Sequence, residues 1–231
     1  MNIFAVSDLH LSIAANKPMD IFGAHWDNHF EKISADWRGK VDDEDVVLIC
    51  GDISWAMRYD DFMPDLAAIE ALPGNKVMIK GNHDYWHTSL SKTRALLDEK
   101  TFFIQNDCIT LGETTFAGSR CWTQKGSDGF DKEDEKIYIR EYDRLKLSLD
   151  KAEKTGFPII VMTHYPPFGL NFTESDYTDL IEKYDVRKVI YGHIHGQAAK
   201  SKDYASMTIG GIEYCLTSCD HLGFSLKKID I

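Results

Sequence analysis

The sequence predicts an α/β fold built around a parallel sheet. Short apolar runs alternate with segments of helical spacing along the first hundred residues, and 43% of the residues are hydrophobic and 27% charged, as in ordinary globular domains. Strands that alternate with helices form parallel sheets, because each helix carries the chain back to the start of the next strand. We find no internal repeat and no linker, so we expect a single domain over residues 1–231.

The first half of the chain supplies the alternation. A strand is expected at Ile3–Val6, and the unbroken apolar run Val46–Cys50 is typical of a strand buried on both faces. Between them, apolar residues from Trp26 to Trp37 recur at helical spacing, and we expect Gly39 to end that helix. The other elements expected here are a helix near Phe62–Leu72, a strand at Val77–Ile79 and a helix at about Ser89–Glu99.

The second half begins with short strands and then returns to the alternation. Leu111-Gly112-Glu113 is typical of a hairpin turn, residues 118–134 have little periodicity and are expected to form a long loop, and the acidic stretch Asp128–Glu135 suits a solvated helix start. We expect antiparallel β-structure from Tyr204 to Ile231. The remaining expected elements are strands at Phe102–Ile104, Cys108–Leu111, Thr114–Ala117, Pro158–Thr163 and Lys188–Tyr191 and helices over Ile137–Ala152 and Asp176–Tyr184.

Charge and cysteine content exclude several classes of protein. A net charge of −11 argues against nucleic acid and against an anionic membrane as partners, because both need basic patches. The first eight residues lack the features of a signal peptide, and no apolar run approaches the 18 residues of a membrane span. The five cysteines are scattered without a C-x-x-C pair, which indicates reduced thiols and a cytoplasmic location.

Polar motifs follow five of the expected strands at the point where each strand ends. Ligand sites in α/β sheets lie at the carboxyl ends of strands, so we expect these motifs to meet. Two aspartates, one asparagine and four histidines are too many ligands for one catalytic metal but suit two, and a nitrogen and oxygen set without thiolate favours Mn²⁺, Fe, Zn²⁺, Co²⁺ or Ni²⁺ over Ca²⁺ or Mg²⁺ alone. The motifs are Asp8-x-His10, Gly51-Asp52, Gly81-Asn82-His83-Asp84, His164 and Gly192-His193-Ile194-His195.

This ordered series resembles that of the calcineurin-like metallophosphoesterase superfamily, and in particular its small prokaryotic-type phosphohydrolases. The motifs extend from Asp8 to His195, so the resemblance covers most of the chain. It implies a four-layer α/β/β/α sandwich with two metal ions at the sheet edges, manganese being the first expectation. It also implies hydrolysis of a phosphomonoester or a phosphodiester in a small phosphorylated substrate, by attack of a metal-bridging hydroxide.

The resemblance further implies a role for each motif residue. Asp52 bridges the two metals, and His83 is the catalytic histidine that protonates the leaving group. The imidazole suits that task because its ordinary pKa is near neutrality. The other implied metal ligands are Asp8, His10 and His195 for one ion and Asn82, His164 and His193 for the other.

Several motif residues differ from those of known subfamilies, and these differences narrow the set of subfamilies that the chain resembles. Protein phosphatases of this superfamily carry G-D-x-V-D-R-G and G-N-H-E, whereas here Asp52 is followed by Ile53-Ser54-Trp55-Ala56 and the third motif ends in Asp84. Trp55 stands where purple acid phosphatases have a tyrosine ligand. Two alternatives stay open: a non-catalytic, metal-stabilised protein-binding module, which has no need of His83, and a nuclease of the same superfamily, which would need a basic stripe.

Several residues outside the ligand set have two interpretations each. Arg120 is a candidate phosphate contact, because a guanidinium binds phosphate oxygens in pairs, or an ordinary arginine paired with an acid. Asp84 either orients His83 or a ligand, or caps a turn. His25 and His29 have a possible metal spacing, although packing is the simpler interpretation.

Overall fold

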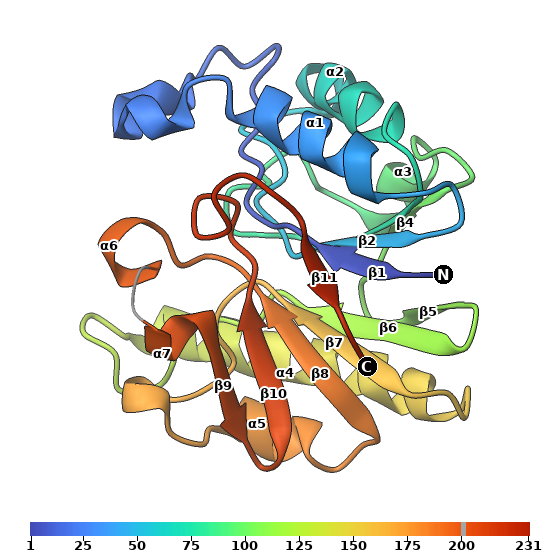
Figure 1. Cartoon of the computed structure of the whole chain (residues 1–231). Coiled ribbons are helices and arrows are strands. Elements are labelled where there is room, and N and C mark those ends of the chain that lie inside the picture. Colours follow the sequence, from blue (N-terminus) through green and yellow to red (C-terminus); the bar gives the residue numbers. More distant parts are fainter. Residues whose placement is uncertain (200–201) are drawn as a thin grey trace.

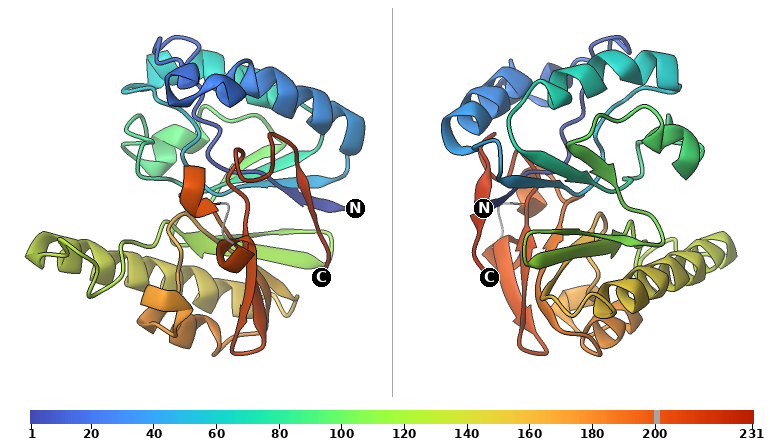
Figure 2. Two further views of the ribbon diagram at one scale, coloured as in Figure 1. Left: turned by 60° about the vertical axis from the view of Figure 1, so that its left-hand side comes forward. Right: turned by 90° about the vertical axis from the view of Figure 1, so that its right-hand side faces the viewer.

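Two β-sheets lie face to face between two layers of helices in this computed structural model, which describes residues 1–199 and 202–231 (Figure 1). Helices α1 and α2 cover the outer face of the first sheet, and α4 and α5 cover the outer face of the second (Figure 2). The expected four-layer α/β/β/α arrangement is therefore confirmed.

The first sheet has the strand order β11-β1-β2-β3-β4, in which β1 to β4 are parallel and β11 runs antiparallel to β1. Its strands are β1 (Ile3–Ala5), β2 (Val46–Ile49), β3 (Asn75–Met78), β4 (Thr101–Phe103) and β11 (Lys227–Ile229). The helices of this half are α1 (His29–Lys40), α2 (Tyr59–Glu70) and α3 (Leu90–Arg94), preceded by the short 3₁₀ turns η1 (Met19–Phe22) and η2 (Ala24–Trp26).

The second sheet has the order β5-β6-β7-β8-β10-β9, with β6, β7, β8 and β10 parallel. Its strands are β5 (Cys108–Leu111), β6 (Thr114–Ser119), β7 (Ile159–Thr163), β8 (Val186–Tyr191), β9 (Ser206–Ile209) and β10 (Ile212–Leu216). Its helices are α4 (Lys132–Glu153), α5 (Asp176–Ile181), α6 (Gly196–Ala199) and α7 (Lys202–Ala205), with the 3₁₀ turn η3 (Leu170–Phe172).

The buried strand β2 shows why the layers form. Val46 and Leu48 pack between the two sheets, while Val47 and Ile49 pack toward the helices of the first half. Successive side chains of a strand point to opposite faces, so a strand covered on both sides must be apolar at every position. The unbroken apolar run in the sequence is the direct result.

Three expectations about elements were wrong in detail. Gly39 lies inside α1 instead of ending it, and α3 is limited to Leu90–Arg94. β10 is antiparallel only to β9 and runs parallel to β8, so the segment after Tyr204 is not uniformly antiparallel. The acidic helix start is confirmed, because the Asp131 side chain accepts hydrogen bonds from the backbone N–H groups of Glu133 and Asp134.

All five cysteines are free thiols, and four of them are buried. Within residues 1–199 and 202–231, every helix is too short or too polar to cross a membrane.

Candidate metal centre

The motif residues meet where strands from both sheets end. Backbone hydrogen bonds join the loops: Asp8 N–H donates to the Gly51 carbonyl at 3.0 Å, and His10 N–H donates to the Asp52 carbonyl at 3.0 Å. Gly192 N–H donates to the His164 carbonyl at 3.2 Å. The seven proposed ligands, far apart in sequence, therefore form one cluster.

The side chains form two groups that could each hold a metal ion. One consists of Asp8, His10 and His195, and the other of Asp8, Asp52 and His164; within each group the ligand atoms lie within 4.8 Å of one another. Asp52 lies between the groups, since its Oδ2 is 3.8 Å from His10 Nε2 and its Oδ1 is 3.5 Å from His164 Nε2.

Asn82 extends the second group. Its Oδ1 lies 2.7 Å from His164 Nε2 and 3.0 Å from His193 Nδ1. The backbone N–H of His193 donates to both oxygens of Asp8 at 3.0 Å, which ties this side of the centre to the first group. The structure thus brings together all seven side chains that the sequence singled out as ligands.

Four of these seven residues have a left-handed backbone. The φ angles are 59° at Asp8, 47° at His10, 49° at Asp52 and 72° at His193. Such a conformation costs an L-residue about 1 kcal/mol or more and is found mainly where the surrounding structure enforces it. The chain therefore accepts local strain to aim these side chains inward.

The motif glycines leave room for the carboxylates. A Cβ atom on Gly81 would overlap Oδ1 of Asp52, and one on Gly192 would overlap Oδ2 of Asp8. Gly51 has φ of +88° and faces the backbone of Gly81, so a side chain there would also be strained. These contacts explain why a glycine stands at each of these three positions.

The centre holds more negative charge than its own side chains balance. Burial and the charge of Asp8 raise the pKa of Asp52 to about 8. Burial opposes ionisation of Asp8 too, but His195, His164 and His10 outweigh it and lower its pKa. Burial disfavours the charged form of His195, yet Asp8 and Asp220 raise its pKa to about 10. The carboxylates therefore attract positive charge to this point.

These residues fit a pair of divalent metal ions. Among the described residues, the buried Nε2 of His195, which lies 3.4 Å from Asp8 Oδ1, has no hydrogen-bond partner. Buried polar atoms without partners are costly, so they indicate a missing ligand. The donor atoms are oxygens and imidazole nitrogens without thiolate, which suits first-row transition ions.

Asp220 belongs to the centre, and the sequence analysis missed it. Its Oδ1 accepts a hydrogen bond from His195 Nδ1 at 2.8 Å, and its Oδ2 accepts one from Gly196 N–H at 3.0 Å. His164 is held likewise, because its Nδ1 donates to the Cys50 carbonyl at 2.8 Å. Both contacts leave Nε2 of the histidine facing the cluster. The sequence feature that could have revealed Asp220 is its position, because Asp220 follows the carboxyl end of the parallel strand β10.

His83 lies at the edge of the cluster. Its backbone N–H donates to Asp52 Oδ1 at 2.8 Å, and its ring centre is 4.4 Å from the Trp55 ring. Trp55 also stacks on the His10 ring at 4.9 Å. The half-buried position and the nearby His164 lower the pKa of His83. His83 is thus fixed by its backbone while its ring borders open space.

The side chain of Asp84 holds neighbouring loops together rather than orienting His83. Its Oδ1 accepts hydrogen bonds from the backbone N–H groups of Ile53 and Ser54, and its Oδ2 accepts one from Gly81 N–H. Trp86 Nε1 also donates to Oδ1. The turn-capping interpretation of Asp84 therefore accounts for its contacts.

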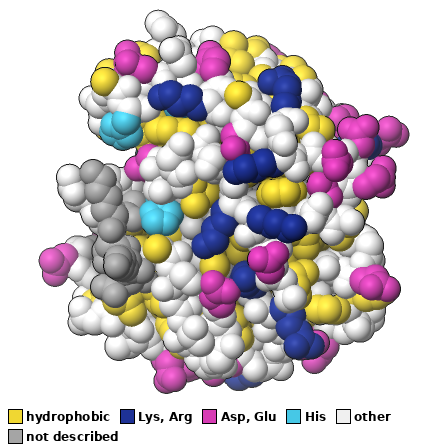
Figure 3. Space-filling model, in the orientation of Figure 1, with side chains coloured by type: hydrophobic (Ala, Val, Ile, Leu, Met, Phe, Trp, Pro, Cys, Tyr) yellow, Lys and Arg dark blue, Asp and Glu magenta, His cyan; other side chains and the backbone are white. Residues whose placement is uncertain are grey.

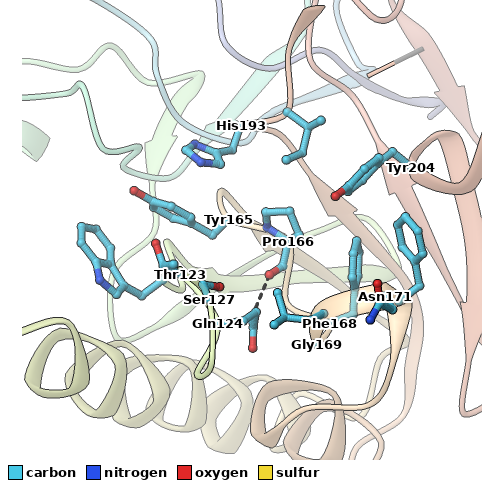
Figure 4. Close-up of a pocket in the computed structure, with 14 residues that line it drawn as sticks. Thr123, Gln124, Ser127, Tyr165, Pro166, Phe168, Gly169, Asn171, His193 and Tyr204 are labelled. Carbon is cyan, nitrogen blue, oxygen red and sulfur yellow. Dashed lines mark hydrogen bonds between the residues drawn. The ribbon is translucent and has the colours of Figure 1, made fainter. Parts of the chain in front are cut away.

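Two cavities adjoin the cluster, and histidine side chains border the hollow seen in Figure 3. A cavity of 420 Å³ lies beside His193 (Figure 4), and one of 330 Å³ lies beside His83, His10 and His195. No Lys, Arg, Asp or Glu is found among the described residues that line the first. Its walls include Trp122, Tyr165, Phe168, Phe172 and Tyr204, and residues of the 118–134 loop form one side.

The remaining candidates have structural partners. Arg120 lines neither of these cavities; its Nη2 lies 3.5 Å from Glu141 Oε1 and its guanidinium covers the Trp122 ring at 4.4 Å. His29 Nε2 bonds to the Leu9 carbonyl at 2.8 Å, which agrees with the packing interpretation. His25 lines the 330 Å³ cavity.

Comparison with known proteins agrees with this geometry. A family model described as calcineurin-like phosphoesterase matches residues 1–197, and no curated protein matches the chain. Among solved structures, the phosphopantetheinyl hydrolase of Mycobacterium tuberculosis is 14% identical with a TM-score of 0.59, over 99% of this chain and 95% of that one. The protein TT1561 of Thermus thermophilus is 14% identical with a TM-score of 0.54, over 99% and 97%. These likenesses show a shared fold.

Proposed function

The chain belongs to the calcineurin-like phosphoesterase family, and we propose that it is a dinuclear metal-dependent phosphohydrolase of small phosphorylated esters. The observation that supports this most is the pair of adjoining ligand groups, Asp8-His10-His195 and Asp8-Asp52-His164, at the ends of strands from both sheets. Two adjacent cations clamp a phosphoryl group and activate water, which is what hydrolysis of a phosphoester needs.

The proposed ligand assignment follows the family pattern. Asp52 is shared, since its two oxygens face histidines of different groups. Two bound ions would neutralise the crowded carboxylates and would lower the pKa of a coordinated water molecule. Manganese is our first choice, with Fe, Zn²⁺, Co²⁺ and Ni²⁺ as alternatives. The assignment gives Asp8, His10 and His195 to one ion and Asn82, His164 and His193 to the other.

His83 is the proposed proton donor to the leaving oxygen. Its ring lines the 330 Å³ cavity beside the ligands and packs against the Trp55 ring, which is tilted by 48° to it. Burial lowers its pKa in the free protein, so the ring is mainly neutral before substrate binds. The negative charge of a bound phosphoryl group favours the imidazolium form, which is the form that can donate a proton.

The 420 Å³ cavity favours substrates with an uncharged organic group. The 420 Å³ cavity offers aromatic walls together with the neutral polar side chains of Thr123, Gln124 and Asn171. Its volume lies within the roughly 300–1,000 Å³ range of small-molecule sites. An organic group of the ester could occupy it while the phosphoryl group lies at the ligand cluster. Monoesters and diesters both meet this description.

Hydrolysis of p-nitrophenyl phosphate and bis-p-nitrophenyl phosphate, measured side by side, tests the proposal. Metal-stripped protein would be reloaded with Mn²⁺, Ni²⁺, Zn²⁺ or Mg²⁺. We expect turnover of at least one ester, and a loss of about 10²- to 10⁴-fold in His83→Ala with metal content and melting temperature unchanged.

Each outcome has a definite meaning. Preference for the diester directs the substrate search to diesters, and preference for the monoester directs it to sugar, nucleotide or lipid phosphates. No turnover by protein that holds two metals would contradict the enzyme and favour the binding module. Full activity in His83→Ala would reject the proton-donor role alone. Cleavage of an oligonucleotide in preference to both esters would favour the nuclease.

A further inference from the structure

A third cavity, of about 130 Å³, lies between the two halves of the fold and apart from the two cavities at the ligand cluster. Its lining comes from the loop after β3, the loop after β4, the end of β6 and the middle of α4. We call it the Lys80 pocket. It is defined by Lys80, Gln105, Asn106, Arg120, Glu141 and Arg144.

The Lys80 pocket has three cations and one carboxylate. Arg144 Nη1 lies 2.8 Å and Arg120 Nη2 lies 3.5 Å from the same oxygen, Oε1 of Glu141. The Glu141 side chain is only 1% exposed, so water does little to compensate either partner. One negative charge therefore serves both guanidinium groups of the pocket.

Lys80 has no carboxylate partner among the described residues. Its Nζ donates to the neutral backbone carbonyl of His87 at 3.2 Å. Keeping an unpaired cation partly buried beside two arginines costs free energy, and the chain as a whole carries a net charge of −11. This local excess of positive charge calls for a compensating anion.

Neutral hydrogen-bonding groups complete the lining. His87 is held by Thr93 Oγ1 at 2.7 Å and Gln105 Oε1 at 2.9 Å. Gln105 uses its oxygen in that contact, which leaves its amide N–H groups as donors. Oδ1 of Asn106 is buried without a hydrogen-bond partner in the described chain, and a half-turn of this amide would present N–H groups at that point. Lys80, Arg120, Arg144 and Gln105 thus give the pocket hydrogen-bond donors.

We propose that the Lys80 pocket binds a tetrahedral oxyanion, either inorganic phosphate or a phosphoryl group. Cations that approach from two loops and one helix suit an ion whose oxygens point in several directions. The cavity is far smaller than a site for an organic ligand, but it exceeds the ~30 Å³ that one water occupies in the liquid, so it has room for a small anion. This inference does not rest on the proposed hydrolase activity.

The position of the pocket gives two sources for the anion. Lys80 lies two residues before Asn82, and the Arg120 carbonyl accepts hydrogen bonds from the backbone N–H groups of His164 and Tyr165 at 3.2 and 2.9 Å. The loops that line the pocket therefore also hold ligand residues. The anion is either free phosphate or a second phosphoryl group of a substrate.

Binding of inorganic phosphate to the metal-loaded protein, counted by equilibrium dialysis, tests the site. We expect two phosphates per chain, one at the metals and one in the pocket, and a single remaining phosphate after metal removal. Lys80→Met is the deciding variant, because it breaks no ion pair. It should weaken the pocket site at least tenfold, as loss of a hydrogen bond to a charged group typically does.

Matched variants distinguish phosphate binding in the pocket from a general effect of the charge of the protein. Arg144→Met should also weaken the site. Arg140→Met removes the same charge from the same helix and should not, since Arg140 is exposed, lies 3.8 Å from Glu141 Oε1 and does not line the pocket. Lys92→Met, on exposed α3, is the control for Lys80→Met. Equal phosphate binding in wild type and Lys80→Met, or an equal loss in both controls, would overturn the proposal.

Kinetic measurements distinguish the two sources of the anion, free phosphate and a second phosphoryl group of a substrate. For a sugar monophosphate and the matching bisphosphate, Lys80→Met should lower kcat/KM about tenfold for the bisphosphate alone if the pocket holds a second phosphoryl group. Unchanged kcat/KM for both esters, together with the lost phosphate site, assigns the pocket to free phosphate. Failure of the hydrolase proposal would not affect the phosphate that remains bound to the metal-free protein, so the two proposals are tested separately.

Discussion

The metal centre and the Lys80 pocket use the same loops but have opposite charge imbalances. Asp8 and Asp52 lie close enough that the charge of Asp8 helps to raise the pKa of Asp52, whereas Arg120 and Arg144 share one carboxylate and Lys80 donates to a neutral backbone carbonyl. The first cluster needs cations and the second needs an anion. Charge balance among buried groups therefore predicts the kind of ligand, and the following substitutions test that difference.

Asp52→Asn should have the largest effect and should separate activity from stability. Loss of the shared carboxylate should remove a metal and lower activity by about 10³-fold or more. In the metal-free protein the same change should raise the melting temperature at pH 7, because Asn avoids the burial and the repulsion from Asp8 that raise the pKa of Asp52 to about 8. Metal content, turnover and thermal unfolding check this. A lower melting temperature of the metal-free variant would contradict the account of the centre.

Glu141→Gln should lower the stability of the protein, in contrast to the higher melting temperature expected for metal-free Asp52→Asn. It leaves two guanidinium groups near a buried amide, and removing one partner of a buried ion pair typically costs about 3 kcal/mol. Chemical denaturation measures the loss. Added phosphate should restore more stability in this variant than in the wild type, since it replaces the missing negative charge. Equal stabilisation of both proteins by phosphate would argue against the comparison.

Asp220→Asn should weaken metal binding without removing a ligand. The carboxylate that accepts from His195 Nδ1 fixes that ring, and loss of such a partner typically costs about 10- to 100-fold in metal affinity. Titration of the metal-free protein with Mn²⁺ measures it. The exposed Asp230→Asn is the matched control and should leave the affinity unchanged.

His87→Gln should produce the smallest effect, on the pH dependence of stability. Burial lowers the pKa of His87 from 6.5 to about 4, so between these values the unfolded chain binds a proton that the folded chain does not. Stability is therefore fully present above pH 6.5 and falls as the pH drops toward 4, by about 2 kcal/mol between pH 7 and 5. Denaturation curves of wild type and variant should diverge over that range. Parallel curves would mean that His87 is not held neutral in the wall of the pocket.

Local patterns in the sequence predict most of the first sheet but not the way the sheets meet. The apolar run at Val46–Cys50 is explicit because both faces of β2 are buried. The four-layer arrangement came only from the family resemblance, since no local pattern specifies which sheet faces which. The parallel pairing of β10 with β8 was missed because a short strand in a hairpin carries no sign of its other neighbour.

The two clusters of polar residues also differ in how far local sequence patterns predict them. The ligand residues stand in compact motifs at strand ends, so their spacing alone indicated the centre. Asp220 was overlooked because it follows β10, whose parallel pairing was not expected. The pocket joins Lys80, Arg120 and Arg144 from three separate elements, and only the folded chain shows that the two arginines share Glu141.

The hydrogen bonds of Asp8 determine when, during synthesis of the chain, the metal centre can form. Asp8 accepts from the backbone of His193, 185 residues later, and the adjacent Ser7 hydroxyl pairs with Thr217, 210 residues away. A ribosome releases Asp8 long before it makes either partner. Metal ions therefore meet a complete ligand set only once the chain has been made as far as His195.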